Sequence, residues 1–226
     1  MKIFLDTAAI DEIRIAARWG VLDGVTTNPS LYAKVGGSYD EILQEICRIT
    51  SGPVSAEVIA ADVEGMLREG RHFAKLAPNI VVKVPMSEEG LEAISRLAEE
   101  GIKTNCTLIF SANQGLLAAK AGASLLSPFV GRIDDINMEG MEVVRDLVAI
   151  VETYGFEAEV LAASIRHPRH MTEAALAGAH VATTPFKILQ QMVHHPLTDK
   201  GIVQFREDWD AARKATAHAG SAKTDA

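Results

Sequence analysis

An α/β fold is predicted by the alternation of two kinds of segment along the 226 residues. Short β-branched apolar runs alternate with longer amphipathic runs, and eight of the short runs can be counted. No linker rich in Pro, Gly or Ser divides the chain, and α/β barrels commonly exceed about 200 residues as one domain. These observations predict a single-domain (β/α)8 TIM barrel with an additional C-terminal helix.

Each expected strand is a short run of mainly apolar residues bounded by charged or turn-forming ones. The expected strands are residues 2–6, 25–28, 54–58, 80–84, 103–108, 125–130, 159–163 and 180–184. An open doubly wound sheet is the alternative arrangement. That fold usually has a glycine-rich turn after its first strand, whereas the sequence here is Asp6-Thr7-Ala8-Ala9.

The helices between the strands are indicated by apolar spacing and by their starts. Residues 91–98 carry apolar side chains at i, i+3 and i+4 spacing. Ser87 precedes two glutamates, Ser111 and Gln114 form a capping box, and Pro168 suits a first helical turn.

The chain beyond the eighth unit predicts one more helix and a tail. Residues 195–217 have a helical pattern and complete a domain that we place at residues 1–217. Residues 218–226 are small and polar, and we expect a disordered tail there.

The composition excludes several classes of protein. Thirty Asp and Glu against 22 Lys and Arg give a net charge of −8, which argues against general binding to nucleic acid or anionic membranes. No apolar run approaches the roughly 18 residues that cross a bilayer, and Asp6 interrupts any secretory signal. Cys47 and Cys106 are too few for a disulfide framework, so we expect a cytoplasmic protein.

Polar side chains recur at the carboxyl ends of the expected strands, where barrel enzymes place their chemistry. Strand residues two apart share a face, so each strand end can direct particular residues into one space. The residues so selected are Asp6, Thr26, Asn28, Ser55, Glu57, Lys83, Asn105, Thr107, Ser127 and Phe129. A barrel that required only stability would carry Val, Ile or Leu at these positions. The pattern therefore predicts an active site.

Lys83 is the most informative of these residues because it lies in an apolar strand with no charged neighbour in sequence. Burial disfavours an ammonium ion, so we expect a neutral amine that can attack a ketone and form a Schiff base. A lysine that reaches solvent from the strand end is the alternative. Lys2 and Lys103 open their strands, and we expect them at the opposite rim.

Three stretches together resemble the transaldolase family, and specifically the short-chain subfamily that also contains fructose-6-phosphate aldolase. They are Leu-Asp-Thr-Ala at residues 5–8, Gly-Val-Thr-Thr-Asn-Pro-Ser at 24–30, and Val-Lys-Val-Pro at 82–85. The similarity continues through residues 195–201 and Asp208-Trp209, so it spans essentially the whole chain.

The resemblance implies a reaction of the pentose phosphate pathway. Lys83 would form a Schiff base with a ketose phosphate, such as sedoheptulose 7-phosphate or fructose 6-phosphate. Its dihydroxyacetone unit would pass to glyceraldehyde 3-phosphate or erythrose 4-phosphate. No metal or organic cofactor is needed. The histidine pairs at 167 and 170 and at 194 and 195 are interpreted as surface residues near helix ends, not as metal ligands.

The resemblance also assigns roles to other residues. Asp6 would handle the proton of the C4 hydroxyl, and Glu57 with Thr107 would hold a catalytic water. The residues that would contact the dihydroxyacetone unit are Thr26, Asn28, Asn105 and Ser127. Those that would bind phosphate are Arg132, Ser164 and Arg166. Arginine suits this role because its guanidinium group can form bidentate hydrogen bonds with phosphate oxygens.

Two positions favour transfer over simple cleavage. Fructose-6-phosphate aldolases resemble this chain but carry Gln in place of Glu57 and Tyr in place of Phe129. Transaldolase is therefore the preferred function and aldolase the alternative. A sugar-phosphate-binding barrel without activity, and an unrelated lysine-dependent aldolase of the deoxyribose-phosphate type, are further alternatives.

The partners implied are sugar phosphates and other copies of the chain, with neither nucleic acid nor membrane. Short relatives form pentamers and decamers in which the C-terminal helix packs on a neighbour. Phe205 and Trp209 could anchor such a contact, or could pack on their own barrel.

Overall fold

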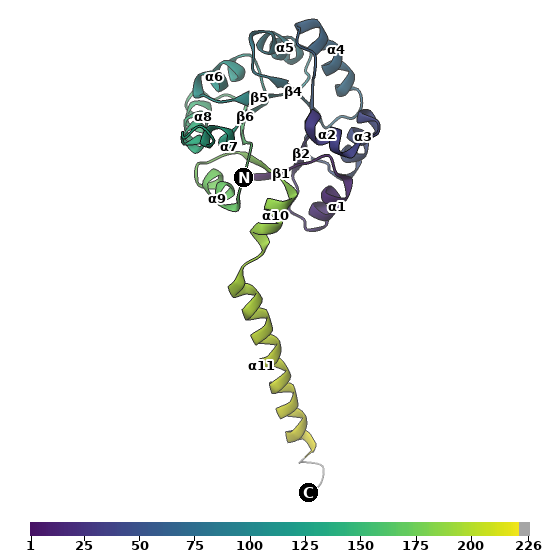
Figure 1. Cartoon of the computed structure of the whole chain (residues 1–226), viewed down its shortest axis with the longest axis vertical. Coiled ribbons are helices and arrows are strands. Elements are labelled where there is room, and N and C mark those ends of the chain that lie inside the picture. The colour runs from purple at the N-terminus through teal and green to yellow at the C-terminus, as the bar shows by residue number, and fades with distance from the viewer. Residues whose placement is uncertain (222–226) are drawn as a thin grey trace. The chain divides into compact units, whose positions relative to one another are not determined.

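The computed structural model contains a closed barrel of eight parallel strands in chain order, which confirms the predicted architecture (Figure 1). It describes residues 1–221, with side chains described as far as Lys214. The strands are β1 Lys2–Asp6, β2 Gly24–Thr26, β3 Val54–Glu57, β4 Ile80–Pro85, β5 Thr104–Ile109, β6 Leu125–Pro128, β7 Glu159–Ala162 and β8 Val181–Thr184.

Helices surround the strands and cover the outer face of the sheet (Figure 1). Those before the C-terminal segment are α1 Ile10–Arg18, α2 Pro29–Val35, α3 Tyr39–Ile49, α4 Val63–Ala74, α5 Glu88–Glu99, α6 Ala112–Lys120, α7 Val130–Asp134, α8 Gly140–Tyr154, α9 Pro168–Leu176 and α10 Phe186–Val193. The expected caps are present, since the Ser87 and Ser111 side chains accept from backbone N–H groups of α5 and α6.

Two strands end two residues before the expected positions because a helix begins there, whereas the other strand ends agree to within one residue. Asn28 was expected in strand two, but β2 ends at Thr26 and Asn28 caps α2. Its Oδ1 accepts from Leu31 N at 3.0 Å, and Pro29, which has no N–H to donate, occupies the first helical turn. Phe129 was expected in strand six but directly precedes α7.

The barrel interior has an apolar layer beneath the polar one. Phe4, Val81, Leu125, Leu161, Ala163 and Val181 pack together there. Gly24 leaves room for the Phe4 ring, because a Cβ at residue 24 would lie 2.6 Å from that ring and 2.7 Å from the Pro53 carbonyl oxygen. The apolar layer closes the barrel below the pocket, so the polar groups above it can be approached only from the carboxyl ends of the strands.

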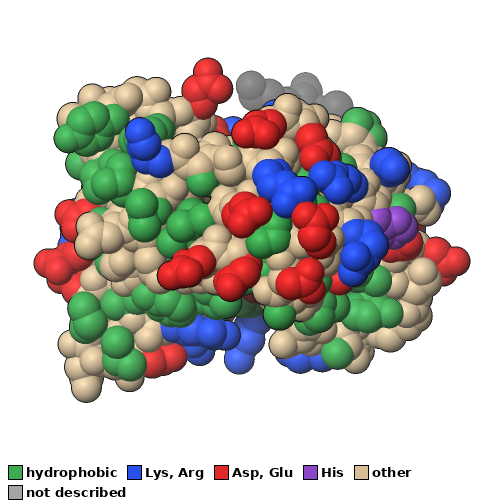
Figure 2. Space-filling view, turned by 90° about the horizontal axis from the view of Figure 1, so that it is seen from above, with side chains coloured by type: hydrophobic (Ala, Val, Ile, Leu, Met, Phe, Trp, Pro, Cys, Tyr) green, Lys and Arg blue, Asp and Glu red, His purple; other side chains and the backbone are tan. Residues whose placement is uncertain are grey.

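The outer helices carry charges of both signs, which Figure 2 shows interspersed on one side of the molecule. Ion pairs connect α4 and α5, with Arg71 to Glu100 at 2.6 Å and Arg96 to Glu64 at 2.8 Å. Exposed pairs of this kind contribute only about 0–1 kcal/mol each, so they keep the surface solvated more than they stabilise it. Among the described residues, no helix has the length and apolarity required to cross a membrane.

The described residues from Leu189 onward form a second compact unit, distinct from the barrel unit of residues 1–188. It contains α11, Pro196–Ser221, which confirms the expected C-terminal helix and carries Phe205 and Trp209. The helix extends four residues past the expected end at 217, so residues 218–221, expected in the tail, are helical. The remaining tail residues, 222–226, lie outside the described part of the chain.

Candidate active site

A pocket of about 280 Å³ opens at the carboxyl ends of the strands, as the alternation of side chains predicted. The residues predicted from the sequence that line it are Asp6, Thr26, Asn28, Lys83, Thr107, Ser127, Phe129, Arg132, Ser164 and Arg166. Glu57 and Asn105 lie behind this lining and bond to it. Residues from most of the barrel strands therefore meet in one place.

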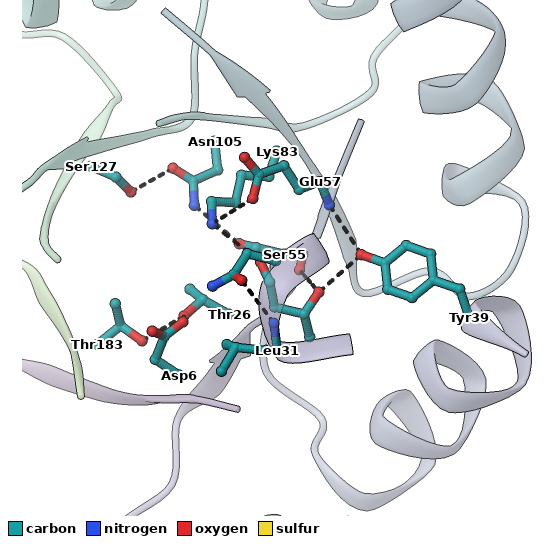
Figure 3. Close-up of polar contacts among 12 residues, drawn as sticks. Asp6, Thr26, Leu31, Tyr39, Ser55, Glu57, Lys83, Asn105, Ser127 and Thr183 are labelled. Atoms are coloured by element: carbon teal, nitrogen blue, oxygen red, sulfur yellow. Dashed lines mark hydrogen bonds and ion pairs between the residues drawn. The ribbon is translucent and has the colours of Figure 1, made fainter. Parts of the chain in front are cut away.

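Lys83 is buried, with 5% of its surface exposed, so it does not reach solvent from the strand end. Its Nζ lies 3.1 Å from Glu57 Oε2 and donates to the Thr27 carbonyl at 3.1 Å (Figure 3). Lys83 has no charged neighbour along the chain, but it has one across the sheet. Glu57 is the register partner of Lys83 on the adjacent strand, and a parallel sheet places such partners side by side.

Asp6 is held on the opposite side of the pocket by two threonines. Its Oδ1 accepts from Thr26 Oγ1 at 2.8 Å, and Thr26 Oγ1 is 2.7 Å from Thr183 Oγ1 (Figure 3). Burial raises the pKa of Asp6, while the Lys83 charge and the Thr26 hydrogen bond oppose the rise. A carboxyl group in this environment can both take up and release a proton nearer neutral pH than an exposed aspartate.

Thr183 is a site residue that the sequence reasoning missed. It lines the pocket from β8, two residues after Val181 of the apolar layer. Lys83 bears the same relation to Val81 on β4. The signal was present in the sequence, because the alternation argument would have selected Thr183 if it had been extended to the eighth strand.

Asn105 is oriented by hydrogen bonds at both ends of its carboxamide. Its Nδ2 donates to Ser55 Oγ at 3.1 Å, and its Oδ1 accepts from Ser127 Oγ at 2.7 Å. Ser55 therefore acts as a support behind the site. Among the described residues, the Thr107 hydroxyl is buried without a hydrogen-bond partner, although it lines the pocket. A buried hydroxyl of this kind is available to a polar atom that enters the pocket.

Two arginines and a serine form the cationic wall of the pocket. The Arg132 guanidinium lies 5.3 Å from the centre of the Phe129 ring, and Arg166 donates to Asp135 Oδ2 at 3.1 Å. Ser164, between them, has a φ of 59°, in the left-handed region that few residues other than glycine adopt. Gly131 lets Ser164 and Arg166 lie close to the backbone of α7. A Cβ at residue 131 would be 2.6 Å from Arg166 Cγ and 2.3 Å from the Ser164 carbonyl oxygen.

His170 supports this wall from behind, which corrects the interpretation of His170 as a surface residue, whereas His167 is exposed at a helix start as expected. His170 is only 5% exposed, and its Nδ1 accepts from Arg166 N at 3.3 Å. Its Nε2 lies 3.0 Å from Asp134 Oδ2, and its ring contacts His167 with centroids 3.7 Å apart. The reason is the helix start at Pro168, which turns residue 170 inward while His167 caps α9.

The residues assigned no chemistry lie away from this pocket. Lys2 and Lys103 line a different hollow at the opposite end of the barrel, as expected, and Lys2 pairs with Glu159 at 2.8 Å. The Cys106 thiol bonds to Met86 Sδ at 3.8 Å, and burial raises its pKa to about 12. Within the described residues, no group of three or more His, Cys, Asp or Glu side chains could hold a metal ion.

Comparison with known proteins gives consistent matches over nearly the whole chain. The family model described as Transaldolase/Fructose-6-phosphate aldolase matches residues 3–224. The "Probable transaldolase" of Heliobacterium modesticaldum is 60% identical over 213 residues, covering 94% of this chain and 99% of that protein. The proteins of the same name from Herpetosiphon aurantiacus and Thermoanaerobacter sp. are 61% identical over 209 residues and 58% identical over 212 residues. These cover 92% and 94% of this chain, and 95% and 98% of those proteins.

The buried His170 predicts a loss of stability in acid. Burial, aided by His167, lowers the pKa of His170 in the folded protein, although Asp134 opposes the shift. The unfolded chain therefore binds this proton more readily as the pH falls below about 6.5, and the folded state loses stability. His170→Gln keeps an acceptor for Arg166 N and a donor for Asp134, so it should reduce this loss. Thermal unfolding of both proteins between pH 7.5 and 5 measures the effect. A difference in Tm between the two proteins that does not change with pH would contradict the assignment.

Proposed function

The chain belongs to the transaldolase/fructose-6-phosphate aldolase family, a family of enzymes, and from that premise we propose that it is a transaldolase working through a Schiff base on Lys83. It would transfer a dihydroxyacetone unit from a ketose phosphate to an aldose phosphate. The observation that carries the proposal is the Lys83 amine, buried at the pocket with the Glu57 carboxylate at 3.1 Å.

The first step is attack of Lys83 Nζ on the C2 carbonyl of the ketose, for which the amine must be unprotonated. Glu57 is placed to accept the proton from the ammonium group at 3.1 Å. Loss of water from the carbinolamine then gives the iminium ion. The Glu57 carboxylate and the free Thr107 hydroxyl support the proposal that they hold this water, both when it leaves and when it returns for hydrolysis.

The second step is cleavage of the C3–C4 bond. Asp6 takes the proton of the C4 hydroxyl, the C3–C4 electrons move to the iminium, and an aldose phosphate leaves. The dihydroxyacetone unit remains on Lys83 as an enamine. Support comes from the position of Asp6 on the same lining and from its raised pKa, which suits a group that must take and return one proton.

Binding of the substrate is divided between two parts of the pocket. Polar groups beside the lysine, those of Thr26, Asn28, Asn105 and Ser127, would bond the hydroxyls of the dihydroxyacetone unit. Arg132, Ser164 and Arg166 would bind the phosphate, which provides local positive charge in a protein whose net charge is −8. Arg166 pairs with the exposed carboxylate of Asp135 and Arg132 lies over the Phe129 ring, and a phosphate dianion would add to or replace these contacts.

Transfer to an acceptor is favoured over release of free dihydroxyacetone by the phenyl ring of Phe129 in the pocket lining. A tyrosine there could deliver a proton to the enamine, which a phenylalanine cannot do. We assign the donors sedoheptulose 7-phosphate and fructose 6-phosphate, with glyceraldehyde 3-phosphate and erythrose 4-phosphate as acceptors, in the pentose phosphate pathway. The free Cys47 and Cys106 thiols are consistent with a cytoplasmic enzyme.

The assembly we propose is a homo-oligomer, a pentamer or decamer by family resemblance. The feature that supports it is α11, a 26-residue helix that carries Phe205 and Trp209.

Borohydride reduction in the presence of fructose 6-phosphate tests the proposed function. We expect a dihydroxyacetone-type adduct on Lys83 by peptide mass mapping, and loss of both adduct and turnover in Lys83→Met. Lys103→Met, at the opposite rim, is the matched control and should give the same amount of Lys83 adduct as the wild type. Because Lys83→Met leaves Glu57 without its partner, its folding is checked by circular dichroism. An adduct on another lysine, or none with a folded wild-type protein, would overturn the mechanism.

The phosphate wall makes a separate prediction about binding. Arg166→Ala should raise the KM for a phosphorylated ketose about 10- to 100-fold, because a charge-assisted hydrogen bond contributes roughly 1.5–3 kcal/mol. Activity with dihydroxyacetone as donor and an unphosphorylated aldehyde as acceptor, neither of which carries a phosphate, should change little. Steady-state kinetics with both donors measures this, and an unchanged KM for the phosphorylated ketose would place the phosphate elsewhere.

Phe129 separates the transferase from the aldolase. Phe129→Tyr should increase the release of dihydroxyacetone from fructose 6-phosphate without an acceptor, because the new hydroxyl can protonate the enamine. Wild-type enzyme should release little free dihydroxyacetone, and with erythrose 4-phosphate as acceptor the unit should appear in sedoheptulose 7-phosphate instead. Rapid acceptor-independent cleavage by the wild type would instead make the chain an aldolase.

A further inference from the structure

The hydrogen-bond ladder between β2 and β3 opens at the residues beside Lys83. Below this point the ladder is regular, with Val25 N donating to the Pro53 carbonyl at 2.9 Å and Thr27 N to the Ser55 carbonyl at 3.1 Å. In a continued parallel ladder, Glu57 N would next donate to the Thr27 carbonyl. Glu57 N instead donates to the Tyr39 hydroxyl at 3.3 Å.

The opening leaves the Thr27 carbonyl without its ladder donor, and Lys83 donates to this carbonyl instead. The Thr27 carbonyl accepts from Lys83 Nζ at 3.1 Å, and the side chain of Glu57 contacts the same Nζ. The phenol of Tyr39 therefore replaces a backbone acceptor for Glu57. Without that replacement, either Glu57 N would lack an acceptor or the two strands would close and compete with Lys83 for the Thr27 carbonyl.

The protons of this cluster can be placed in one consistent order. Thr27 Oγ1 donates to the Ser55 carbonyl at 2.8 Å, so its oxygen is free to accept from the Tyr39 hydroxyl, 3.0 Å away. The Tyr39 oxygen in turn accepts from Glu57 N. Burial raises the pKa of Tyr39, so the phenol keeps the proton that this order requires.

Tyr39 is held rigidly outside the pocket. It is the first residue of α3, and its ring packs edge-on against Phe73, with centroids 5.6 Å apart, and against Tyr32 at 4.9 Å. Figure 3 shows the phenol reaching the strand from the helix side, while Lys83 projects on the barrel side. Tyr39 can therefore influence the reaction only through Thr27 and Glu57.

We propose that Tyr39 is a positioning residue that sets the geometry of the Lys83 and Glu57 pair by taking the place of a ladder acceptor. The inference rests on the proposed function, since it concerns the rate at which Lys83 forms its Schiff base. It predicts an effect on the chemical step and none on phosphate binding, because Arg132, Ser164 and Arg166 belong to other elements.

The test is Tyr39→Phe, which removes one oxygen and keeps the packing of the ring. Single-turnover borohydride trapping with fructose 6-phosphate measures Schiff-base formation, and steady-state kinetics gives kcat and KM separately. We expect trapping and kcat to fall roughly 3- to 10-fold, the value of one hydrogen bond, with an unchanged KM for the phosphorylated donor. Tyr32→Phe is the matched control, because its hydroxyl bonds only to the Gly37 carbonyl among the described residues. It should behave as the wild type.

A second variant keeps the proposal testable if Tyr39→Phe folds poorly. Thr27→Val removes the acceptor of the Tyr39 hydroxyl but retains the Thr27 carbonyl, and should lower the trapping rate in the same direction. Trapping at the wild-type rate in folded Tyr39→Phe, or a lower Tm without any change in kcat, would overturn the positioning role alone. Absence of an adduct in the wild type would instead overturn the proposed function on which the role rests.

Discussion

The buried pair of Lys83 and Glu57 is the constraint on which the rest of the site depends. Placing an ammonium group inside a barrel is unfavourable, and the chain offsets it with a carboxylate at 3.1 Å and a backbone carbonyl at the same distance. Glu57 comes from the adjacent strand β3 and Thr27 directly follows β2, so these contacts exist only when β2, β3 and β4 are in register. The proposed reaction requires an amine that is not hydrogen-bonded on all sides, and this arrangement leaves Lys83 on the lining of the pocket.

The barrel separates the demands of stability and chemistry along each strand. Phe4, Val81, Leu125 and Val181 build the apolar layer, and two residues further along lie Asp6, Lys83, Ser127 and Thr183. The packed layer excludes water from below, which strengthens the electrostatic interactions of the polar layer above it. Gly24 shows how closely the two are connected, since a side chain there would displace the Phe4 ring on which the packing depends.

The two halves of the pocket are built by different means. The groups around Lys83 and Asp6 lie on strands and are oriented by hydrogen bonds between side chains, which suits a reaction that needs fixed distances. The half that we propose binds phosphate lies on the chain segments after β6 and β7 and on α7. It is held there by the unusual backbone of Ser164, by Gly131 and by the buried His170. A phosphate dianion would be bound mainly by charge and would tolerate small changes in distance, so residues outside the strands would be adequate there.

The sequence by itself determined the fold class, the eight strands and most of the pocket lining. Alternation of side chains and apolar periodicity are local properties of the sequence. In a parallel barrel they decide directly which strand residues point into the barrel and which point toward the surrounding helices. What only the tertiary structure decided are contacts between residues far apart in the chain. Glu57 beside Lys83, Tyr39 behind Glu57, and His170 beneath Arg166 all depend on strand register or on how a helix packs. The ends of β2 and β6 were also misplaced, because a helix start at Pro29 or Val130 competes with strand continuation. That competition is settled by the hydrogen bonds available in the folded chain, which no single stretch of sequence contains.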